Sequence, residues 1–303
     1  MTITEPTETG KRPSRITAAQ LRDAGATRRP RMARVKIRIG AILTALVVLP
    51  VALAGLLPLP GSTEQDLGSR RLPPLTDGHL FGTDQLGRDL LARVLDGGQV
   101  SILIGVLAVL VSGLIGLTAG AAAGYFGGWC DAVISRLLEA QMSLPLLMML
   151  LLVVALFGPS VPVITAVIAI AQWPEVARLT RSMVLVEREK PYVDAARTLG
   201  LSHRGVLFRH LVPNVVRQTS LVVLLLLAQA VLLESALSYL GAGPERPFAT
   251  WGRLISDGQD YVTTSWWLVT LPGLVIVLLV VGVNLLGDGL RDTVRGTKKG
   301  VAA

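Results

Sequence analysis

Residues 188–214 read REKPYVDAARTLGLSHRGVLFRHLVPN, a polar and basic stretch that lies between two strongly apolar ones. Its charges exclude it from lipid, so it predicts a loop at a membrane surface. Pro191 suits the first turn of a helix, Gly200 can supply the positive φ that ends it, and Ser202 can cap a second helix. The stretch therefore predicts a short helix, a corner and another helix.

The predicted helix after Pro191 has two different faces. Small and apolar residues recur at helical spacing on one face, and polar residues occupy the other. A short amphipathic helix held between two membrane spans is suited to a groove on another protein, although a solvated hairpin is the alternative. The first face comprises Tyr192, Ala195, Ala196 and Leu199, and the second comprises Asp194, Arg197 and Thr198.

The spacing within this stretch resembles the EAA motif of permease subunits of ABC importers. Asp194-Ala195-Ala196 is followed by Gly200 six positions after the Asp and by Pro213 another thirteen on, with Asp where the family usually has Glu. The resemblance implies a coupling helix that seats in a cytoplasmic ATPase. On that basis, the expected ATPase-coupling residues of the loop 182–214 are Tyr192, Asp194, Ala195, Ala196, Arg197, Leu199, Gly200, His203 and Arg204.

The composition is that of an integral membrane protein. The 303 residues are 51% hydrophobic and 17% charged, with a mean hydropathy of +0.57, which is too apolar for an ordinary soluble domain. Cys130 is the only cysteine, which excludes an internal disulfide. The prediction is an all-α fold with six transmembrane helices of about 20 residues each. They lie near 39–59, 100–124, 137–157, 161–180, 215–240 and 267–286.

Lysine and arginine set the predicted orientation. With the N-terminus inside, 23 of the 29 basic residues lie on the cytoplasmic side and six lie outside. The positive-inside rule favours this topology, which makes both termini and the loop 182–214 cytoplasmic. The net charge of +8 is explained by this topology, and nucleic acid is not an expected partner.

The predicted domain organisation has four parts. Residues 1–38 are expected to form a disordered, basic cytoplasmic tail, because they contain almost no large apolar residues. Residues 39–98 would hold the first span and an external loop, residues 99–292 a five-helix permease core, and residues 293–303 a C-terminal tail. The external loop is expected to contain an amphipathic helix that Thr83 or Asp84 caps, with Leu86, Leu90 and Val94 on one face and Gly97-Gly98 at its end.

Three further runs resemble the C-type permeases of dipeptide and oligopeptide importers. They are FGTDQLGRDLLARVLDGGQVS at 81–101, ESALSYLGAGPERPFATWGRLISDG at 234–258 and NLLGDGLRD at 284–292. The resemblance implies a type I ABC importer (MetI-like) permease fold in a bacterial plasma membrane. It also implies three kinds of partner: a second, B-type permease, two cytoplasmic ABC ATPase subunits or domains, and an extracellular substrate-binding protein.

A few polar and small residues within the predicted spans are candidates for other roles. Gln229, Glu234 and Asn284 could line a translocation pathway, since intramembrane polar residues should face protein or water. Glu234 could equally make a structural hydrogen bond to a neighbouring helix, and Asn284 could cap a helix end. A stripe of small residues every four positions predicts close helix packing, namely Ser112, Gly116, Gly120 and Gly124.

The sequence contains no recognisable catalytic motif. It lacks the P-loop, the H-E-x-x-H zinc motif and the G-x-S-x-G nucleophile motif, so an enzyme is not expected and no cofactor is expected on this chain. If ATP powers transport, ATP and Mg²⁺ act in partner subunits. A self-contained secondary transporter or channel is the alternative class. Within the resembled family, peptides are the expected cargo, with nickel and glutathione as alternatives.

Overall fold

The computed structural model describes residues 18–245 and 248–300, and every named element of this part is helical. The α-helices are α1 (Ala18–Ala52), α2 (Leu90–Phe126), α3 (Gly128–Met142), α4 (Leu146–Phe157), α5 (Val161–Glu187), α6 (Pro191–Thr198), α7 (His203–Val206), α8 (Val212–Leu237), α9 (Trp251–Gly258) and α10 (Trp267–Gly300). Short helical turns are η1 (Ala54–Leu56), η2 (Leu207–Leu211), η3 (Ser238–Ala242) and η4 (Gln259–Tyr261).

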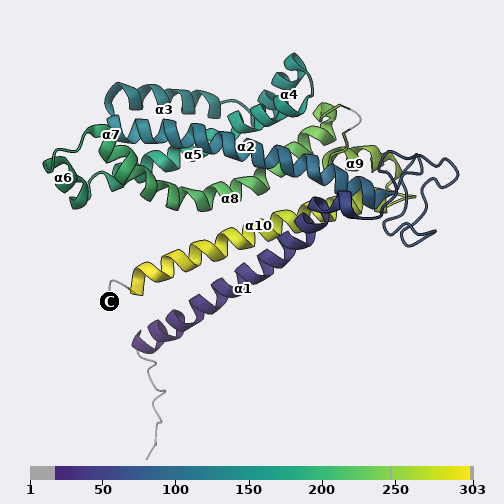
Figure 1. Cartoon of the computed structure of the whole chain (residues 1–303), viewed down its shortest axis with the longest axis horizontal. Coiled ribbons are helices and arrows are strands. Elements are labelled where there is room, and N and C mark those ends of the chain that lie inside the picture. Colours follow the sequence, from purple (N-terminus) through teal and green to yellow (C-terminus); the bar gives the residue numbers. More distant parts are fainter. Residues whose placement is uncertain (1–17, 246–247, 301–303) are drawn as a thin grey trace, which may run out of the picture.

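The long helices form two groups that meet at one end of the molecule (Figure 1). Helices α2, α5 and α8 pack together with α3 and α4 along one side, while α1 runs alongside α10. The loop 57–89 and α9 lie at the end where the groups meet. Helices α6 and α7 lie at the opposite end, on the same side as the C-terminal end of α10.

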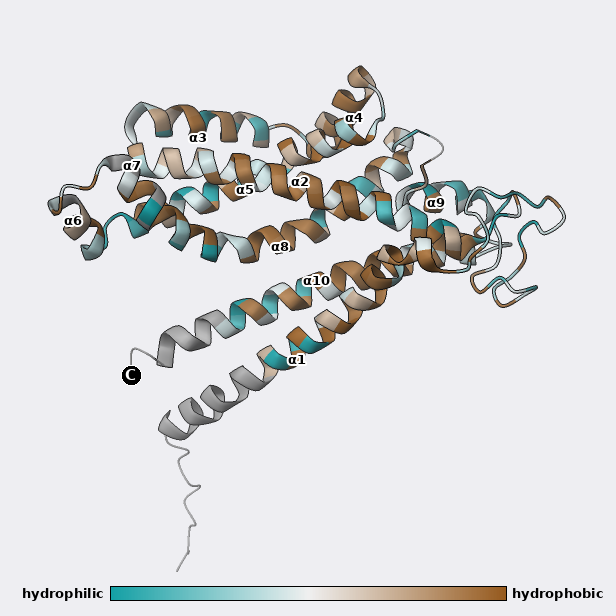
Figure 2. Cartoon of the chain, viewed as in Figure 1, coloured by the Kyte–Doolittle hydropathy of each residue, from teal (hydrophilic) through white to brown (hydrophobic). Residues whose placement is uncertain are grey.

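Five helices in the described part are long and apolar enough to cross a membrane, or six if the bent pair α3 and α4 is one span. Apolar residues dominate the middle of these helices, and polar residues gather at the two ends of the molecule (Figure 2). This arrangement confirms the all-α membrane class.

The third predicted span, 137–157, is not one continuous helix. Helices α3 and α4 are bent by 89° at residues 143–145. Pro145 has no N–H to continue the α3 ladder, and the Ser143 hydroxyl donates to the Ala140 carbonyl oxygen at 2.7 Å, a bond that competes with further helix. The apolar composition of 146–157 predicted a span but could not reveal this bend.

The predicted amphipathic helix of the external loop is wrong in its boundaries. Helix α2 begins only at Leu90, where the Asp89 carboxylate accepts from the Ala92 N–H at 2.8 Å, and it continues through Gly97 and Gly98. A β-carbon at Gly97 would lie 3.3 Å from the Thr250 backbone. These two glycines therefore admit the α9 segment, and they do not end a helix.

The predicted tails also differ from the structure over their described parts. Helix α1 begins at Ala18, inside the predicted disordered segment 1–38, and α10 continues to Gly300, inside the predicted tail 293–303. Each helix supports the other beyond the apolar region, where the Lys36 ammonium donates to the Asp292 carboxylate at 2.8 Å. Residues 1–17 and 301–303 of the predicted tails lie outside the described residues.

Close packing of α1 depends chiefly on α10. Small residues let the two backbones approach: a β-carbon at Gly282 would lie 2.8 Å from the Thr44 backbone nitrogen, and one at Gly40 would lie 2.6 Å from the Leu286 nitrogen. Near the α9 end, Val47 and Val51 of α1 join a buried apolar cluster with Trp251. The first and last helices thus form a paired unit that joins the rest of the fold mainly at one end.

Candidate functional site

The predicted helix-corner-helix is present at the end formed by α6 and α7. Helix α6 begins at Pro191, and Gly200 has a φ of +81°, which ends it. The Leu201 N–H donates to the Ala196 carbonyl oxygen at 3.2 Å, and the Gly205 N–H donates to the Ser202 hydroxyl at 3.2 Å. A C-terminal glycine motif followed by a serine cap therefore fixes the direction of the chain at this corner.

The inner face of α6 differs from the prediction. Val193 and Ala196 are buried in an apolar cluster with Tyr125, Val184 and Leu211. The sequence assigned Tyr192, Ala195, Ala196 and Leu199 to one face, but Ala195 is exposed and Leu199 is 81% exposed. The register is shifted because α2, α5 and α8 together offer Val193 an apolar cluster to pack in, whereas Leu199 lies outside it.

The outer face of α6 consists of Asp194, Ala195 and Leu199, all of which are exposed. Leu199 is 81% exposed, one helical turn after the small residue Ala195, so this face of α6 presents an apolar side chain to its surroundings. The side chains of Arg197, His203 and Arg204, which were also predicted to contact a partner, lie outside the described ones.

A polar cluster joins α6 to two long helices. The buried Glu187 carboxylate at the end of α5 accepts from the Tyr192 hydroxyl at 2.9 Å and from the Lys190 ammonium at 2.6 Å. The Asn214 amide of α8 donates to the Tyr192 hydroxyl at 3.3 Å. Burial of Tyr192, together with its bond to Glu187, raises the pKa of the phenol above its ordinary value.

The same corner is attached to α2. The Arg188 guanidinium donates to the carbonyl oxygen of Gly124 at 2.9 Å, close to the end of that helix. Helix α6 is therefore held by α2, α5 and α8 together. Sequence reasoning missed this attachment because its residues are scattered along the chain.

Glu234 is fully buried, and it lies among hydroxyl groups. The Ser238 hydroxyl donates to its carboxylate at 2.6 Å and the Ser235 hydroxyl at 3.5 Å, while Ser101 of α2 and Thr250 are also hydrogen-bond partners. These contacts join α8 to α2 and to the start of α9. They favour the structural alternative for Glu234 over a place in an open pathway.

Gln229 and Asn284, the other two pathway candidates, are exposed on α8 and α10. The structure does not bring them together with Glu234 into one cavity. Gln172 of α5 is another buried polar residue, and its amide donates to the Leu226 carbonyl oxygen at 3.0 Å. The sequence alone could not predict that Gln172 makes this hydrogen bond between α5 and α8.

The stripe of small residues on α2 lies against α5. A β-carbon at Gly116 would lie 2.8 Å from the Trp173 carbonyl oxygen, and one at Gly120 would lie 2.7 Å from the Thr180 β-carbon. Gly124 approaches the Arg181 carbonyl oxygen in the same way, and Ser112 is fully buried one turn before Gly116. The two backbones approach closely along this whole stripe.

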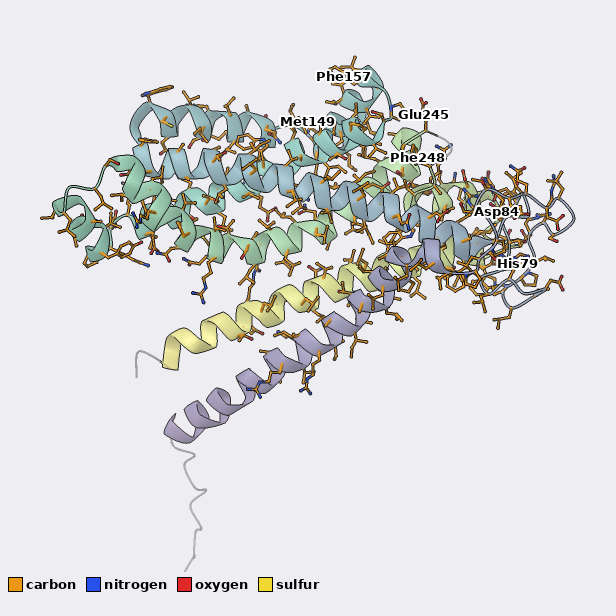
Figure 3. All side chains as sticks on the ribbon, viewed as in Figure 1. His79, Asp84, Met149, Phe157, Glu245 and Phe248 are labelled. Carbon is orange, nitrogen blue, oxygen red and sulfur yellow. The ribbon has the colours of Figure 1, made fainter. Side chains whose placement is uncertain are left out.

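The opposite end of the molecule contains a buried ionic cluster centred on Asp84 (Figure 3). The Asp84 carboxylate accepts from the Arg88 guanidinium at 2.7 Å and also pairs with Arg93. Burial alone would raise the pKa of this carboxyl, but the backbone N–H of Arg88 and the charge of Arg93 hold it below its ordinary value.

Further contacts join the loop to the helices beside it. His79 pairs with the Asp89 carboxylate at 2.7 Å, and the Trp267 indole N–H donates to the Thr83 carbonyl oxygen at 3.3 Å. The loop 57–89 is therefore fastened to the starts of α2 and α10. The signal that could have revealed this was the run of acidic and basic residues at 84–93.

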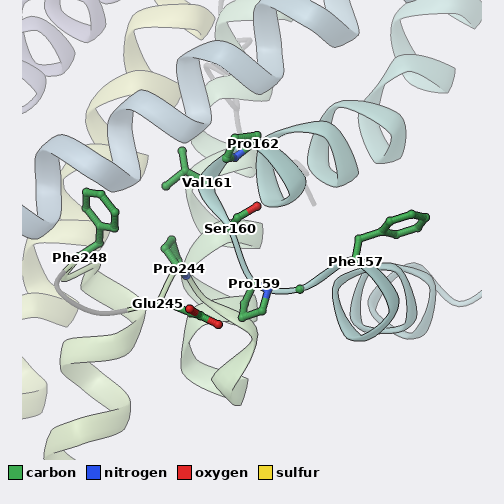
Figure 4. Close-up of a pocket in the computed structure, with 9 residues that line it drawn as sticks. Phe157, Pro159, Ser160, Val161, Pro162, Pro244, Glu245 and Phe248 are labelled. Carbon is green, nitrogen blue, oxygen red and sulfur yellow. The ribbon is translucent and has the colours of Figure 1, made fainter.

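A cavity of about 590 Å³ opens near the same end, between the turn that joins α4 to α5 and the segment after η3 (Figure 4). Its lining is mostly apolar, and the Glu245 N–H donates to the Pro159 carbonyl oxygen at 3.2 Å beside it. The residues that line the cavity are Phe157, Gly158, Pro159, Ser160, Val161, Pro162, Pro244, Glu245 and Phe248. In the described part of the chain, no group of three or more His, Cys, Asp or Glu residues could hold a metal ion.

Residues 116–296, more than half of the chain, match the family described as the binding-protein-dependent transport system inner membrane component. The chain belongs to this family. The matched region contains α5, α6 and α8, so the helix-corner-helix lies within the part of the chain that the family covers.

Relatives within this permease family extend the match. The chain is 38% identical to the oligopeptide transport system permease protein OppC of Escherichia coli strain K12 over 220 residues, which cover 73% of each chain. It is 34% identical to the dipeptide transport system permease protein DppC of Bacillus subtilis strain 168, over 86% of this chain and 82% of that protein. The comparisons favour a permease subunit over a self-contained secondary transporter or channel.

Solved structures support the fold. The MetNI methionine ABC transporter in inward-facing conformations superposes with a TM-score of 0.53 at 15% identity, over 65% of this chain and 94% of that one. An amino acid ABC transporter solved with histidines gives a TM-score of 0.52 at 19% identity, over 65% and 91%. The chain is thus a multi-pass membrane protein with the permease fold of the ABC importers.

Proposed function

We propose that this chain is one half of the transmembrane pathway of an ATP-driven ABC importer for peptides, and that α6 receives the motion of a cytoplasmic ATPase. The observation that carries the coupling role is α6 itself: its inner face is fastened to three long helices, and its outer face, with Asp194, Ala195 and Leu199, is exposed. Peptide cargo is supported by the relatives, which are named for dipeptide and oligopeptide transport.

The proposed assembly contains partners that this chain does not include. A second, B-type permease completes the pathway, one of two cytoplasmic ABC ATPase subunits or domains binds at α6, and a substrate-binding protein docks at the end formed by α9 and the loop 57–89. ATP and Mg²⁺ act in the ATPase subunits. In this orientation the α6 end and both termini face the cytoplasm, in line with the excess of basic residues there.

The proposed mechanism is alternating access. Closure of the ATPases moves α6, whose Tyr192 contacts Glu187 of α5 and Asn214 of α8. Its Val193 packs in one cluster with Tyr125 of α2, and these contacts transmit the motion to the three helices. The pathway then opens toward the loaded binding protein and later toward the cytoplasm. ATP drives the cycle because it shifts the population between the outward-open and the inward-open state.

Substitutions at Gly200 test the coupling role. Gly200→Val would strain the corner, since a β-branched residue disfavours a φ of +81°, whereas Gly200→Asn is tolerated there. We expect Gly200→Val to remain in the membrane but to lose most stimulated ATP hydrolysis and uptake, and Gly200→Asn to retain both. The readouts are copurification of ATPase subunits with the tagged chain, ATP hydrolysis and peptide uptake.

Two results would contradict the proposal. One is full uptake by Gly200→Val, and the other is an active chain that purifies without any ATPase subunit. The cargo is decided separately, by isolating the cognate binding protein and identifying the peptide, metal or glutathione that it retains.

A further inference from the structure

The non-helical segment between α3 and α4, residues 143–145, is exposed on the surface of this chain. We name it the α3–α4 break. Ser143, Leu144 and Pro145 are all exposed, and Leu144 is 56% exposed. The chain turns by 89° here, between two helices that together would make one span.

Hydrogen bonds place the α3–α4 break at the middle of the membrane. The Gln141 amide N–H donates to the carbonyl oxygen of Ile170, near the centre of the predicted span 161–180 within α5. Two residues further along α5, Gln172 donates to the Leu226 carbonyl oxygen, near the centre of α8. Ser143 is only about 3 Å along the chain from Gln141, so the break lies well inside the roughly 15 Å half-thickness of the hydrocarbon.

The backbone of the α3–α4 break is unsuited to lipid. Helix α4 begins at Leu146 without a side-chain cap on its first N–H groups, and Pro145 precedes it. Lipid tails offer no hydrogen bonds, so irregular backbone at this depth occurs only where protein covers it or water reaches it. The exposed side of the break must therefore meet one of these two.

Charged side chains on the neighbouring helix favour water. The Arg178 guanidinium contacts the Met142 sulfur at the end of α3, and Glu175 lies one turn before Arg178 on α5. Both are exposed, and they lie about 8 and 12 Å along α5 from Ile170, still within the hydrocarbon half-thickness. Charges left in a dry protein interface would carry a desolvation cost that water avoids.

From these observations we infer that the α3–α4 break lines the aqueous translocation route, where it would contact hydrated, polar solute. The inference rests on the proposed function and assigns a segment of the chain to that pathway. The pathway segment inferred here is residues 143–145, which belong to none of the sequence motifs, and Glu234 is not part of it. Gln141 acts here as a positioning residue: it also accepts from the Trp173 indole N–H at 2.8 Å and so fixes the end of α3 on α5.

Cysteine accessibility tests the inference in the assembled transporter. Cys130 is the only native cysteine, so Cys130→Ser supplies a cysteine-free background for Ser143→Cys and Leu144→Cys. The matched control is Leu114→Cys on the unbroken helix α2, where Leu114 is 66% exposed and thus at least as open as Leu144. Its neighbour Gly113 faces Val223, and Gly116 faces Trp173, which places it at a similar depth. The probe is a charged, water-soluble methanethiosulfonate reagent, applied to membrane vesicles.

We expect both cysteines of the α3–α4 break to react about tenfold or more faster than the Leu114→Cys control, because the reactive thiolate forms only where water reaches it. Equal, slow rates at all three positions would overturn the inference and place the break against lipid. Protection at the break with an efficient crosslink to a second permease would overturn it in favour of a dry protein interface. Copurification of ATPase subunits from the same vesicles decides the proposed function separately.

Discussion

Asp84 shows how one residue can organise the loop 57–89. Its carboxylate accepts from the backbone N–H of Leu86 at 2.8 Å and pairs with Arg88 and with Arg93, which is buried. Sequence reasoning treated Asp84 only as a helix cap and did not use the charged run at 84–93, which contains both Asp84 and Arg93. The structure instead makes it the acceptor for two arginines.

Replacing Asp84 should destabilise the loop 57–89. Asp84→Asn leaves the buried Arg93 charge without its closest partner, and breaking a buried pair in this way costs about 3–5 kcal/mol of unfolding free energy. Thermal unfolding in detergent, followed by fluorescence of Trp251 and Trp267, measures the loss. Asp257→Asn is the control: it lies 3.9 Å from the same arginine and is partly exposed, so its loss should stay below about 1 kcal/mol.

The pH dependence of the same contact follows from the sign of the shift. The pKa of Asp84 is lowered in the folded chain, so its contribution is complete above the ordinary value of about 3.9 and is lost only as the pH falls through the lower folded pKa. Between about pH 5 and about pH 8 the stability difference between Asp84→Asn and the native chain should therefore not change. A difference that shrinks across this range would contradict the assignment.

At the scale of elements, periodicity and composition predicted which segments are membrane-spanning helices better than they predicted where those helices begin, bend or end. Apolar runs located α1, α2, α5, α8 and α10, since a span needs about 20 such residues whatever its neighbours are. Pro145 is visible in the sequence, but the bend between α3 and α4 was missed because it also depends on contacts to α5. The face of α6 was shifted because burial of Val193 depends on α2, α5 and α8 together.

The contact between α2 and α5 gives an element-scale prediction. Gly120→Leu places a large side chain against Thr180 and the Ala177 carbonyl oxygen, so the helices must separate, at a cost of about 1–3 kcal/mol or more. Gly113→Ala is the control, since the nearest atom to its β-carbon, on Val223, would be 3.9 Å away. We expect a lower unfolding temperature in detergent only for Gly120→Leu. Equal temperatures for the two variants would contradict the packing role.

At the scale of the whole molecule, the two ends of the fold differ: α6 lies at one end and the loop 57–89 lies at the other. Cys130, close to the start of α3, lies at the same end as α6, because Tyr125 near the end of α2 packs in one cluster with Val193. The loop 57–89 lies at the other end. One native thiol can therefore report which end faces the cytoplasm.

Labelling of Cys130 tests the proposed orientation. An impermeant maleimide should leave the chain unmodified in intact cells and should modify it in inside-out vesicles. The reverse pattern is expected for Cys130→Ser with Thr63→Cys, since Thr63 is exposed in the opposite loop. Modification of Cys130 in intact cells would place α6 outside the cell, and coupling to a cytoplasmic ATPase would then be impossible.

The pairing of α1 with α10 has a consequence for biosynthesis. Helix α1 ends at Ala52, but α10, the helix it packs against, begins only at Trp267. During synthesis, α1 therefore lies in the bilayer without its partner until the residues up to α10 have been made. A nascent chain interrupted before Trp267 leaves the small-residue side of α1 without its companion. Such truncated products should be degraded by membrane proteases, because α1 would lack the helix that it packs against.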